Sequence, residues 1–223
     1  AQVNAANRDR QRALPWAEIE QFTLSGLGSI SIPRAYGGPQ VSFVTVAEVF
    51  RIISAADPAL GQIPQNQFGI LHLLQGSATE QQKKTLFQSV LDGWRIGNAG
   101  PERGTKNTPE LKARITANGD RLSITGQKFY STGALFAHWV AVKALDDQGR
   151  QIMAFVQRGK PGLRIVDDWS GFGQRTTASG TVLLDNVPVD RRGHRARRHR
   201  RRDCLCTREI PSVDRRQRRA RQR

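Results

Sequence analysis

Residues 1–190 contain no cysteine, because both cysteines of this 223-residue chain, Cys204 and Cys206, stand near its end. This part of the chain can therefore form no internal disulfide, which is typical of proteins from a reducing compartment. Apolar residues make up 38% of the chain, but none of their runs approaches the roughly 18 residues that a membrane span needs. No secretory leader is visible either, so we expect a cytoplasmic protein without a membrane partner.

The chain also lacks an initiator methionine and opens inside a polar pattern, AQVNAANRDRQRALP. We therefore expect further residues upstream. Cys204 and Cys206 lie close to His194 and His199, but there is no second pair of ligands at the spacing of a zinc finger. The sequence predicts no metal site.

The strong positive charge of the chain, +16, is concentrated at its end. Residues 191–223 hold fifteen arginines, no lysine and three acidic residues, so the preceding 190 residues carry a net charge of only +4. This segment has neither helical nor strand periodicity, and we expect it to be disordered. An arginine-rich arm that binds nucleic acid is one interpretation. We favour an out-of-frame segment, because the preceding β domain breaks off unfinished, so nucleic acid is not the expected partner.

Residues 1–95 are predicted to form a helical domain. A helix is expected from Pro15 and Trp16 to the glycines at 26 and 28. Apolar side chains from Val46 to Ile53 have amphipathic helical spacing, and residues 66–74 form a further apolar segment. Ser77 and Glu80 have the spacing of a capping box for the next helix, which Gly93 would end.

Residues 96–190 change to the alternating pattern of strands, so an antiparallel β-barrel domain is predicted after the helices. A hairpin is expected at Asn118-Gly119, between strands at 114–117 and 122–130. Further strands are expected at 139–144, 152–156, 163–166 and 181–184. The fold class is therefore α+β, with a helical domain followed by a β-barrel.

One stretch, residues 124–142 (ITGQKFYSTGALFAHWVAV), combines two apolar strands with a hydroxyl-rich turn. Tyr130, Ser131 and Thr132 would place an aromatic ring and two hydroxyls on a rigid sheet edge, which suits a flat heteroaromatic ligand. The alternative is an ordinary turn, in which Ser131 and Thr132 only bond the backbone. The spacing of these residues alone does not distinguish a ligand-binding turn from an ordinary one.

Four phrases, RIISAADPALGQIPQNQF, GNAGPERGTKN, KFYSTGALFAHW and DDWSGFGQRTTASGTVLLDNVPV, resemble the acyl-CoA dehydrogenase superfamily. The resemblance covers about residues 8–190 and is strongest to its sulfur-acquisition oxidoreductases and dibenzothiophene monooxygenases. It implies a helical domain, a β-barrel that contacts a flavin, and a C-terminal four-helix domain. The chain has no recognisable counterpart of that last domain.

The resemblance also implies roles for individual residues. Thr132 corresponds to the hydroxyl near the reactive N5 edge of the flavin, and is the residue expected to take part in catalysis. The flavin contacts that it implies are Asn98, Ala99, Glu102, Tyr130, Ser131, Thr132 and Trp169, and the substrate-pocket residues are Gln67, Trp169 and Arg175.

Two departures from the family pattern bear on the reaction. The usual T/S-E-P-G-x-G-S-D phrase of acyl-CoA dehydrogenases is replaced by a sequence that begins Ala99-Gly100-Pro101-Glu102, which argues against a CoA thioester. The monooxygenase-like branch would have a histidine close to Gln67, and glutamine cannot shuttle a proton at neutral pH. His72 is expected to be a helix-surface or core histidine rather than its substitute.

The sequence thus predicts a flavin-dependent oxidoreductase, with FMN or FAD as cofactor, that oxygenates small organosulfur compounds in sulfur acquisition. The resemblance implies a flavin reductase or an electron-transfer flavoprotein as partner, and a homotetramer in the full-length protein. The alternatives are an acyl-CoA dehydrogenase that takes a CoA thioester, and a non-enzymatic module that binds nucleic acid through its basic end.

Overall fold

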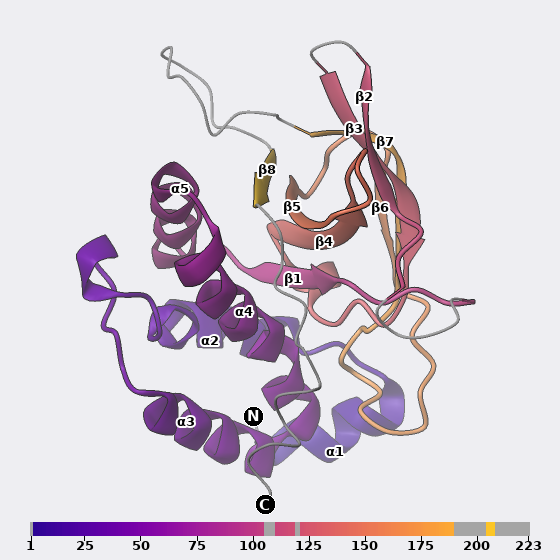
Figure 1. Ribbon diagram of the computed structural model, residues 1–223. Coiled ribbons are helices and arrows are strands. Elements are labelled where there is room, and N and C mark those ends of the chain that lie inside the picture. The colour runs from indigo at the N-terminus through magenta and orange to yellow at the C-terminus, as the bar shows by residue number, and fades with distance from the viewer. Residues whose placement is uncertain (1, 105–109, 119–120, 190–203, 208–223) are drawn as a thin grey trace, which may run out of the picture.

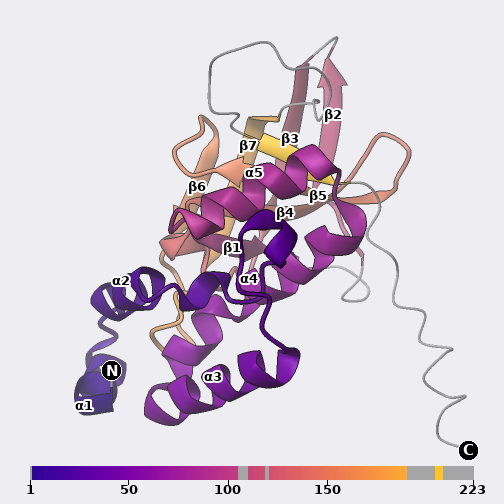
Figure 2. The same cartoon turned by 90° about the vertical axis from the view of Figure 1, so that its left-hand side faces the viewer.

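The protein is described by a computed structural model, which covers residues 2–104, 110–118, 121–189 and 204–207. Five α-helices come first in the chain and gather on one side of a sheet (Figures 1 and 2). They are α1 (Gln2–Gln11), α2 (Trp16–Leu24), α3 (Phe43–Ala56), α4 (Pro58–Ser77) and α5 (Glu80–Leu91), with two 3₁₀ turns, η1 (Leu27–Ser29) and η2 (Arg34–Tyr36), between α2 and α3.

Asp57 joins α3 to α4 and fixes the start of the longer helix. Its carboxylate accepts hydrogen bonds from the backbone N–H groups of Ala59 and Leu60, at 3.0 and 3.1 Å, and so caps two donors that the first turn of a helix leaves unpaired. Pro58 follows at the first helical position, where its missing N–H costs nothing. The sequence predicted α3 well, but its estimate of α4 as residues 66–74 was too short.

The residues that start α5 differ from those predicted. Thr79 and Gln82 form the capping box: the Thr79 hydroxyl accepts from the Gln82 backbone N–H at 3.3 Å, and the Gln82 side chain accepts from the Thr79 N–H at 2.8 Å. Ser77 instead ends α4 and donates to the Leu73 carbonyl. The capping box assigned to Ser77 and Glu80 was therefore wrong by two residues, because two boxes overlap in the sequence.

The sequence does not predict helix α1, because its residues form a polar stretch without apolar periodicity. Its stability comes from distant partners: the Arg8 guanidinium donates to Asp57 at 2.7 Å and also pairs with Glu18 of α2. Arg8 and Asp57 are both buried. A helix that is held by an ion pair to a residue 49 positions away leaves no apolar periodicity in the sequence.

The strands form one curled sheet. They are β1 (Ile96–Ala99), β2 (Arg114–Asn118), β3 (Arg121–Lys128), β4 (Trp139–Leu145), β5 (Gln151–Gln157), β6 (Leu163–Val166), β7 (Thr181–Val189) and β8 (Cys204–Thr207). Their order is β6-β7-β3-β2-β4-β5-β8, with β1 paired to β4 outside this path. The predicted hairpin is confirmed by the antiparallel pairing of β2 with β3, although Gly119 and Asp120 lie outside the described residues.

The sheet is mixed, whereas the sequence predicted an antiparallel barrel. Strand β1 runs parallel to β4, with Asn98 opposite Ala141, and β2 meets β4 in parallel at one residue pair. Strand β1 was missed because four residues, IGNA, are too short to show alternation. Its parallel placement is possible because β2, β3 and a 3₁₀ turn, η3 (Ala134–Phe136), lie between it and β4 in the chain.

Strands β4 and β5 are buried on both faces and separate two cores. One face of the sheet encloses a core that includes Val140, Val142, Ala154 and Val156. The opposite face carries Trp139, Ala141, Met153 and Phe155, which pack against apolar side chains of α4 and α5. Alternate residues therefore point to the two sides, and the helices cover the face that would otherwise leave Trp139 and Phe155 in water.

Only residues 204–207 of the arginine-rich end are described, and their backbone pairs with β5 in antiparallel register. The expectation of disorder for residues 191–223 otherwise falls outside the described residues. None of the helices in the described part of the chain is long and apolar enough to cross a bilayer.

We predict that Asp57→Ala lowers the free energy of unfolding by about 3 kcal/mol, measured by denaturant titration. The substitution removes a helix cap and leaves Arg8 buried without this carboxylate, two losses that cost about 1 and about 3 kcal/mol when measured singly and are not additive. Asp92→Ala, at an exposed helix end where the carboxylate accepts from Gln88, is the control and should cost under about 0.5 kcal/mol. Equal effects of the two substitutions would contradict this role of Asp57.

Candidate functional site

The predicted hydroxyl-rich turn connects β3 to η3 and has an unusual backbone. Tyr130 has φ 54° and Gly133 has φ 79°, both in the left-handed region. Tyrosine rarely adopts this conformation, and such strained residues cluster at functional sites. The strain turns the three residues Tyr130, Ser131 and Thr132 in different directions within a short segment: the Tyr130 side chain is exposed, while Ser131 and Thr132 are buried.

Strand β1 lies directly against this turn because Gly97 has no side chain. A Cβ atom at Gly97 would stand 2.5 Å from the Ala134 Cα, so any other residue would push the two segments apart. The backbone N–H of Asn98 donates to the Thr132 carbonyl at 3.2 Å. The fold thus brings Asn98 and Ala99 next to residues 130–132, as the prediction requires, although Ala99 is itself completely buried.

The exposed Tyr130 and the half-buried Trp169 form an aromatic corner. Their ring centroids lie 6.2 Å apart and the ring planes meet at 86°. The guanidinium group of Arg103 lies over the Tyr130 ring, 5.1 Å from its centroid, and over Phe129 at 4.4 Å, distances typical of cation–π contacts. Two perpendicular rings with a cation beside them offer both stacking and edge contacts to a planar ligand.

Thr132 belongs to a chain of buried hydroxyl groups whose hydrogen-bond direction can be deduced. The Thr177 hydroxyl donates to the Gln174 carbonyl at 3.1 Å, since a carbonyl only accepts. Either hydroxyl could be the donor in the 2.8 Å contact between Thr177 and Ser179; with the one hydrogen of Thr177 given to Gln174, the donor is Ser179. Thr132 is then the donor in its 2.7 Å contact with Ser179. The Thr132 oxygen is left with lone pairs alone, and can only accept a further hydrogen bond.

Ser131 is the neighbour of this chain and has an unsatisfied hydroxyl. Its backbone N–H donates to the Gly180 carbonyl at 3.0 Å, but its buried Oγ atom has no hydrogen-bond partner among the described residues. A buried polar atom without a partner is costly, and often marks the position of a ligand or water. Ser131 and Thr132 thus offer two adjacent oxygens for polar contact.

The loop before β7 connects the aromatic corner to the hydroxyl chain. The Gln174 carbonyl accepts from the Trp169 indole N–H at 3.0 Å as well as from Thr177. Arg12, directly after α1, donates to the Trp169 carbonyl at 3.0 Å, and Arg175 donates to the carbonyl of Asp9 in α1 at 3.0 Å. Arg175, predicted in the substrate pocket, therefore bonds α1, and its place in a pocket stays a prediction.

Glu102 is held by a buried ion pair. Its Oε1 atom lies 2.6 Å from Lys128 Nζ, and both side chains are almost fully buried. The two carboxylate oxygens also accept from the backbone N–H groups of Ala113 and Lys112, at 3.0 and 2.7 Å. With these partners Glu102 fastens the loop after β1 to the strand that leads into Tyr130, and its predicted contact with a cofactor stays a prediction.

Burial and hydrogen bonding oppose one another in this ion pair. Burial alone would raise the pKa of Glu102, but the hydrogen bonds from Lys128, Ala113 and Lys112 outweigh it, so the pKa lies below its usual value of 4.5. Burial lowers the pKa of Lys128 more than Glu102 raises it. Glu102 is therefore charged near neutral pH, and its interaction with Lys128 weakens in acid.

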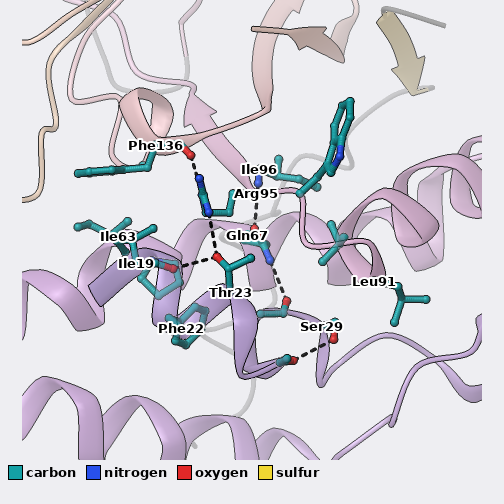
Figure 3. Close-up of a pocket in the computed structure, with 16 residues that line it drawn as sticks. Ile19, Phe22, Thr23, Ser29, Ile63, Gln67, Leu91, Arg95, Ile96 and Phe136 are labelled. Atoms are coloured by element: carbon teal, nitrogen blue, oxygen red, sulfur yellow. Dashed lines mark hydrogen bonds between the residues drawn. The ribbon is translucent and has the colours of Figure 1, made fainter. Parts of the chain in front are cut away.

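Gln67 lies on α4, beneath β1, and lines a cavity with an apolar wall (Figure 3). Its side chain donates to the Gly28 carbonyl at 2.8 Å and accepts from the Ile96 N–H at 2.9 Å. Both of its polar ends are thus engaged within the protein. His72 is exposed and packs edge-on against Phe43, as expected of a helix-surface histidine. Asn98 borders a different depression, of about 280 Å³, together with Gln65, Asn66 and Lys143.

Sequence reasoning missed Ser179, Thr177 and Lys128. A signal exists for the first two, since the run Thr176 to Ser179 (TTAS) is unusually rich in hydroxyls before an apolar strand. Lys128 gives a weaker signal, a lysine at a position that strand alternation turns inward, where it is fully buried. Among the described residues, no cluster of His, Cys, Asp or Glu side chains could hold a metal ion.

Comparisons with known proteins show similarity in sequence and in fold. Residues 1–93 match the family model described as "Acyl-CoA dehydrogenase, N-terminal domain". A dibenzothiophene monooxygenase of Rhodococcus erythropolis is 31% identical over 195 residues, which are 84% of this chain and 46% of the relative. The "Probable FMNH2-dependent monooxygenase SfnC" of Pseudomonas putida is 26% identical over 193 residues, 83% of this chain and 46% of the relative.

A solved structure extends the similarity to the fold. The FMN-bound TdsC of Paenibacillus sp. A11-2 superposes with a TM-score of 0.79 at 28% identity, covering 85% of this chain and 49% of TdsC. The chain thus spans about half the length of the relatives that it matches. The similarity supports the expected order of a helical part followed by a curled sheet.

We predict that the free energy of unfolding falls less steeply with decreasing pH in Glu102→Gln than in the parent protein. Because the pKa of Glu102 is lowered in the folded protein, its contribution is complete above about pH 4.5, the unfolded value, and is lost as the pH falls through the folded pKa. Unfolding free energies measured from pH 7 to pH 3 should show this loss in the parent and a smaller loss in the variant. At pH 7 the variant should be about 3 kcal/mol less stable, because Lys128 remains buried beside a neutral amide.

Glu48→Gln is the matched control for this comparison. Glu48 also has a lowered pKa, caused by its hydrogen bond with Arg51, but both side chains are exposed. Surface ion pairs contribute little, so the control should follow the parent curve. If the unfolding free energy of Glu102→Gln fell with pH as steeply as that of the parent, the pKa of Glu102 would not differ between the folded and unfolded protein.

Proposed function

We propose that the chain belongs to the acyl-CoA dehydrogenase superfamily and supplies the flavin-contacting part of a monooxygenase. The proposed cofactor is FMN in its reduced form, and the proposed substrates are small organosulfur compounds. The names of its relatives support both proposals, since they include dibenzothiophene monooxygenases and a probable FMNH2-dependent monooxygenase. A flavin reductase is the partner that would supply reduced FMN, and assembly into a homotetramer stays a prediction.

The residues around Tyr130 fit a flavin. Tyr130 and Trp169 form the aromatic corner against which a planar ring can pack. The buried Ser131 hydroxyl has no partner among the described residues and is free for a polar edge. When bound, the flavin would supply the redox chemistry. The protein residues would hold the ring, orient its N5 edge towards Thr132 and exclude water from that edge.

The proposed preference for reduced flavin follows from the direction of the hydrogen bonds that lead from Thr132 to Ser179 and Thr177. Thr132 gives its only hydrogen to Ser179, so its oxygen acts solely as an acceptor towards a ligand. In a reduced flavin the N5 atom bears a hydrogen and is a donor, whereas in an oxidised flavin N5 is an acceptor. Two acceptors repel one another, and therefore Thr132 would favour the reduced form.

This observation separates the two enzymatic candidates. An acyl-CoA dehydrogenase takes up its substrate with oxidised flavin, so a hydroxyl that donates to N5 would serve it better. A monooxygenase that receives reduced FMN from a reductase needs the opposite polarity, which is the one deduced for Thr132. We therefore prefer the monooxygenase, although the superfamily includes the dehydrogenases.

The activity itself is tested by supplying the protein with FMNH2, ¹⁸O₂ and dibenzothiophene or a small sulfinate. We expect one ¹⁸O atom on the sulfur of the product, detected by mass spectrometry, while the second leaves as water and FMNH2 is oxidised to FMN. A parallel sample with oxidised FMN receives acyl-CoA thioesters. Bleaching of the flavin by a thioester, without oxygen incorporation, would establish the dehydrogenase instead.

We predict that Thr132→Val weakens the binding of FMNH2 roughly fivefold, the equivalent of about 1 kcal/mol for one lost hydrogen bond. Valine keeps the shape of threonine but has no oxygen. The affinity for oxidised FMN should not fall and should rise slightly, because that form makes no hydrogen bond at this position and the variant removes the repulsion between the two acceptors. Anaerobic calorimetry with each redox form measures both affinities.

Ser179→Ala provides the second half of this experiment. Without its acceptor, the Thr132 hydroxyl can turn its hydrogen towards the ligand, so the affinity for oxidised FMN should rise relative to that for FMNH2. Ser89→Ala, which removes a hydroxyl bonded to the Thr85 carbonyl on α5, is the control. Equal changes for the two redox forms in Thr132→Val would refute the deduced polarity.

A further inference from the structure

The depression that Asn98 borders lies between α4 and the strands β1, β4 and β5, on the face of the sheet that the helices cover. Helix α4 runs alongside β1 there (Figures 1 and 2). Four of its lining residues have polar side chains, namely Gln65, Asn66, Asn98 and Lys143. Apart from Asn98, none of these four has a role in the function proposed above.

Lys143 interrupts a row of apolar side chains on β4. Side chains at alternate positions of a strand share a face, so Lys143 lies on the same face as Trp139 and Ala141, which pack against the helices. Met153 stands opposite Lys143 on β5 and belongs to the same apolar core. A lysine at this position gives up apolar packing, and such departures from the local pattern are expected at functional positions.

The charge of Lys143 has no counter-ion. Its ammonium group has no hydrogen-bond or ion-pair partner in the described part of the chain. None of the described residues that line the depression is acidic. Glu102, on the loop after β1, is already bonded to Lys128 and to two backbone N–H groups. The half-buried Lys143 therefore makes the depression positively charged, and an anion would be attracted to it.

Three side-chain amides surround the same space. Gln65 and Asn66 stand on α4 and Asn98 on β1, and none of the three amides has a hydrogen-bond partner among the described residues. Asn98 and Lys143 approach one another beside Gly100, where a Cβ atom would lie 3.2 Å from Asn98 Oδ1 and 3.5 Å from Lys143 Cδ. Amide N–H groups beside an ammonium group are suitable donors for an oxyanion.

The remaining wall is largely apolar. Ile70 and Leu73 of α4 and Met153 of β5 contribute to it. The depression has a volume of about 280 Å³, which exceeds the roughly 150 Å³ of a cavity that holds benzene. An inorganic ion would leave the apolar wall in contact with water, whereas an acid with a short apolar chain would cover it. The depression thus fits a small organic oxyanion.

We propose that this depression binds a small organic oxyanion, with Lys143 as its counter-ion and the Asn98 amide as a hydrogen-bond donor. The site lies next to the Thr132 turn, because the Asn98 backbone N–H donates to the Thr132 carbonyl. Binding depends on no flavin, so it can be measured separately from any reaction.

The extension of this site to a substrate rests on the monooxygenase function proposed above. Alkyl sulfinates are small organic oxyanions, so the depression would favour them over neutral organosulfur compounds. A sulfinate would gain one oxygen atom from O₂ through a new S–O bond and become a sulfonate. The second oxygen atom would leave as water, and FMNH2, which supplies the two electrons, would become FMN.

Met153 provides a reporter at the site, because it is the only methionine of the 223-residue sequence. We label the methionine methyl group with ¹³C, assign its signal with Met153→Leu, and titrate the protein with propanesulfinate. Methyl propyl sulfoxide is the neutral control, since a methyl group replaces its charged oxygen. We expect the sulfinate to shift the Met153 signal with a Kd roughly tenfold lower than that of the sulfoxide.

Substitutions of lysine test whether Lys143 is responsible. Lys143→Gln removes the charge and should raise the Kd of propanesulfinate roughly tenfold, while that of the sulfoxide should stay within about twofold. Lys143→Arg keeps the charge and should retain most of the affinity for the sulfinate. Lys84→Gln removes an exposed lysine of α5 outside the depression, and this control should bind like the parent.

Equal affinities for the sulfinate and the sulfoxide, or an unchanged affinity in Lys143→Gln, would overturn the proposal. Displacement of the sulfinate by FMN but not by riboflavin would assign the site to the cofactor phosphate, and would overturn its extension to a substrate. Sulfinate binding at Lys143 without ¹⁸O incorporation would uphold the anion site and refute the proposed reaction. Incorporation into the sulfinate with a KM that Lys143→Gln leaves unchanged would do the reverse.

Discussion

The side-chain amide of Gln67 connects three segments that are far apart in the sequence. It donates to the carbonyl of Gly28 in η1 and accepts from the Ile96 N–H at the start of β1, while its own backbone lies in α4. Ile96 pairs with β4 on one side only, so its N–H would otherwise be a buried donor without a partner. Loss of such a bond costs more than its formation contributes. The position of β1, and with it the contact between Gly97 and the Thr132 turn, therefore depends on this glutamine.

The candidate site depends in turn on two segments that meet only through the fold. Lys128 and Glu102 join the strand before Tyr130 to the loop after β1, and both are buried. Ser179 and Thr177 reach the same turn from a loop 47 residues further along the chain. Because both connections are buried and hydrogen-bonded, the Tyr130 backbone is held in a conformation that tyrosine does not favour. Pre-organisation of this kind reduces the entropy that a ligand loses on binding.

The sequence predicted those elements whose cause is local. Helix α3 follows from its apolar spacing, and the β2–β3 hairpin follows from the glycine at its turn. Helix α1 and strand β1 could not be predicted in this way, since an ion pair to Asp57 and a parallel partner in β4 stabilise them. The site divides similarly. Tyr130, Ser131 and Thr132 stand together in one turn, whereas the partner of Thr132 is known only once the chain has folded.

The hydroxyl chain also shows why residue identity alone does not determine a chemical role. A threonine can donate or accept, and the resemblance to a family assigns it only to a place near a flavin edge. Whether Thr132 donates or accepts depends on the last group of the hydrogen-bonded series, the Gln174 carbonyl, which can only accept. That constraint passes through Thr177 and Ser179 and fixes the Thr132 oxygen as an acceptor. In the function that we propose, a backbone carbonyl of the loop before β7 would thereby set the redox form of flavin that the turn prefers, although it lies two hydroxyl groups away from Thr132.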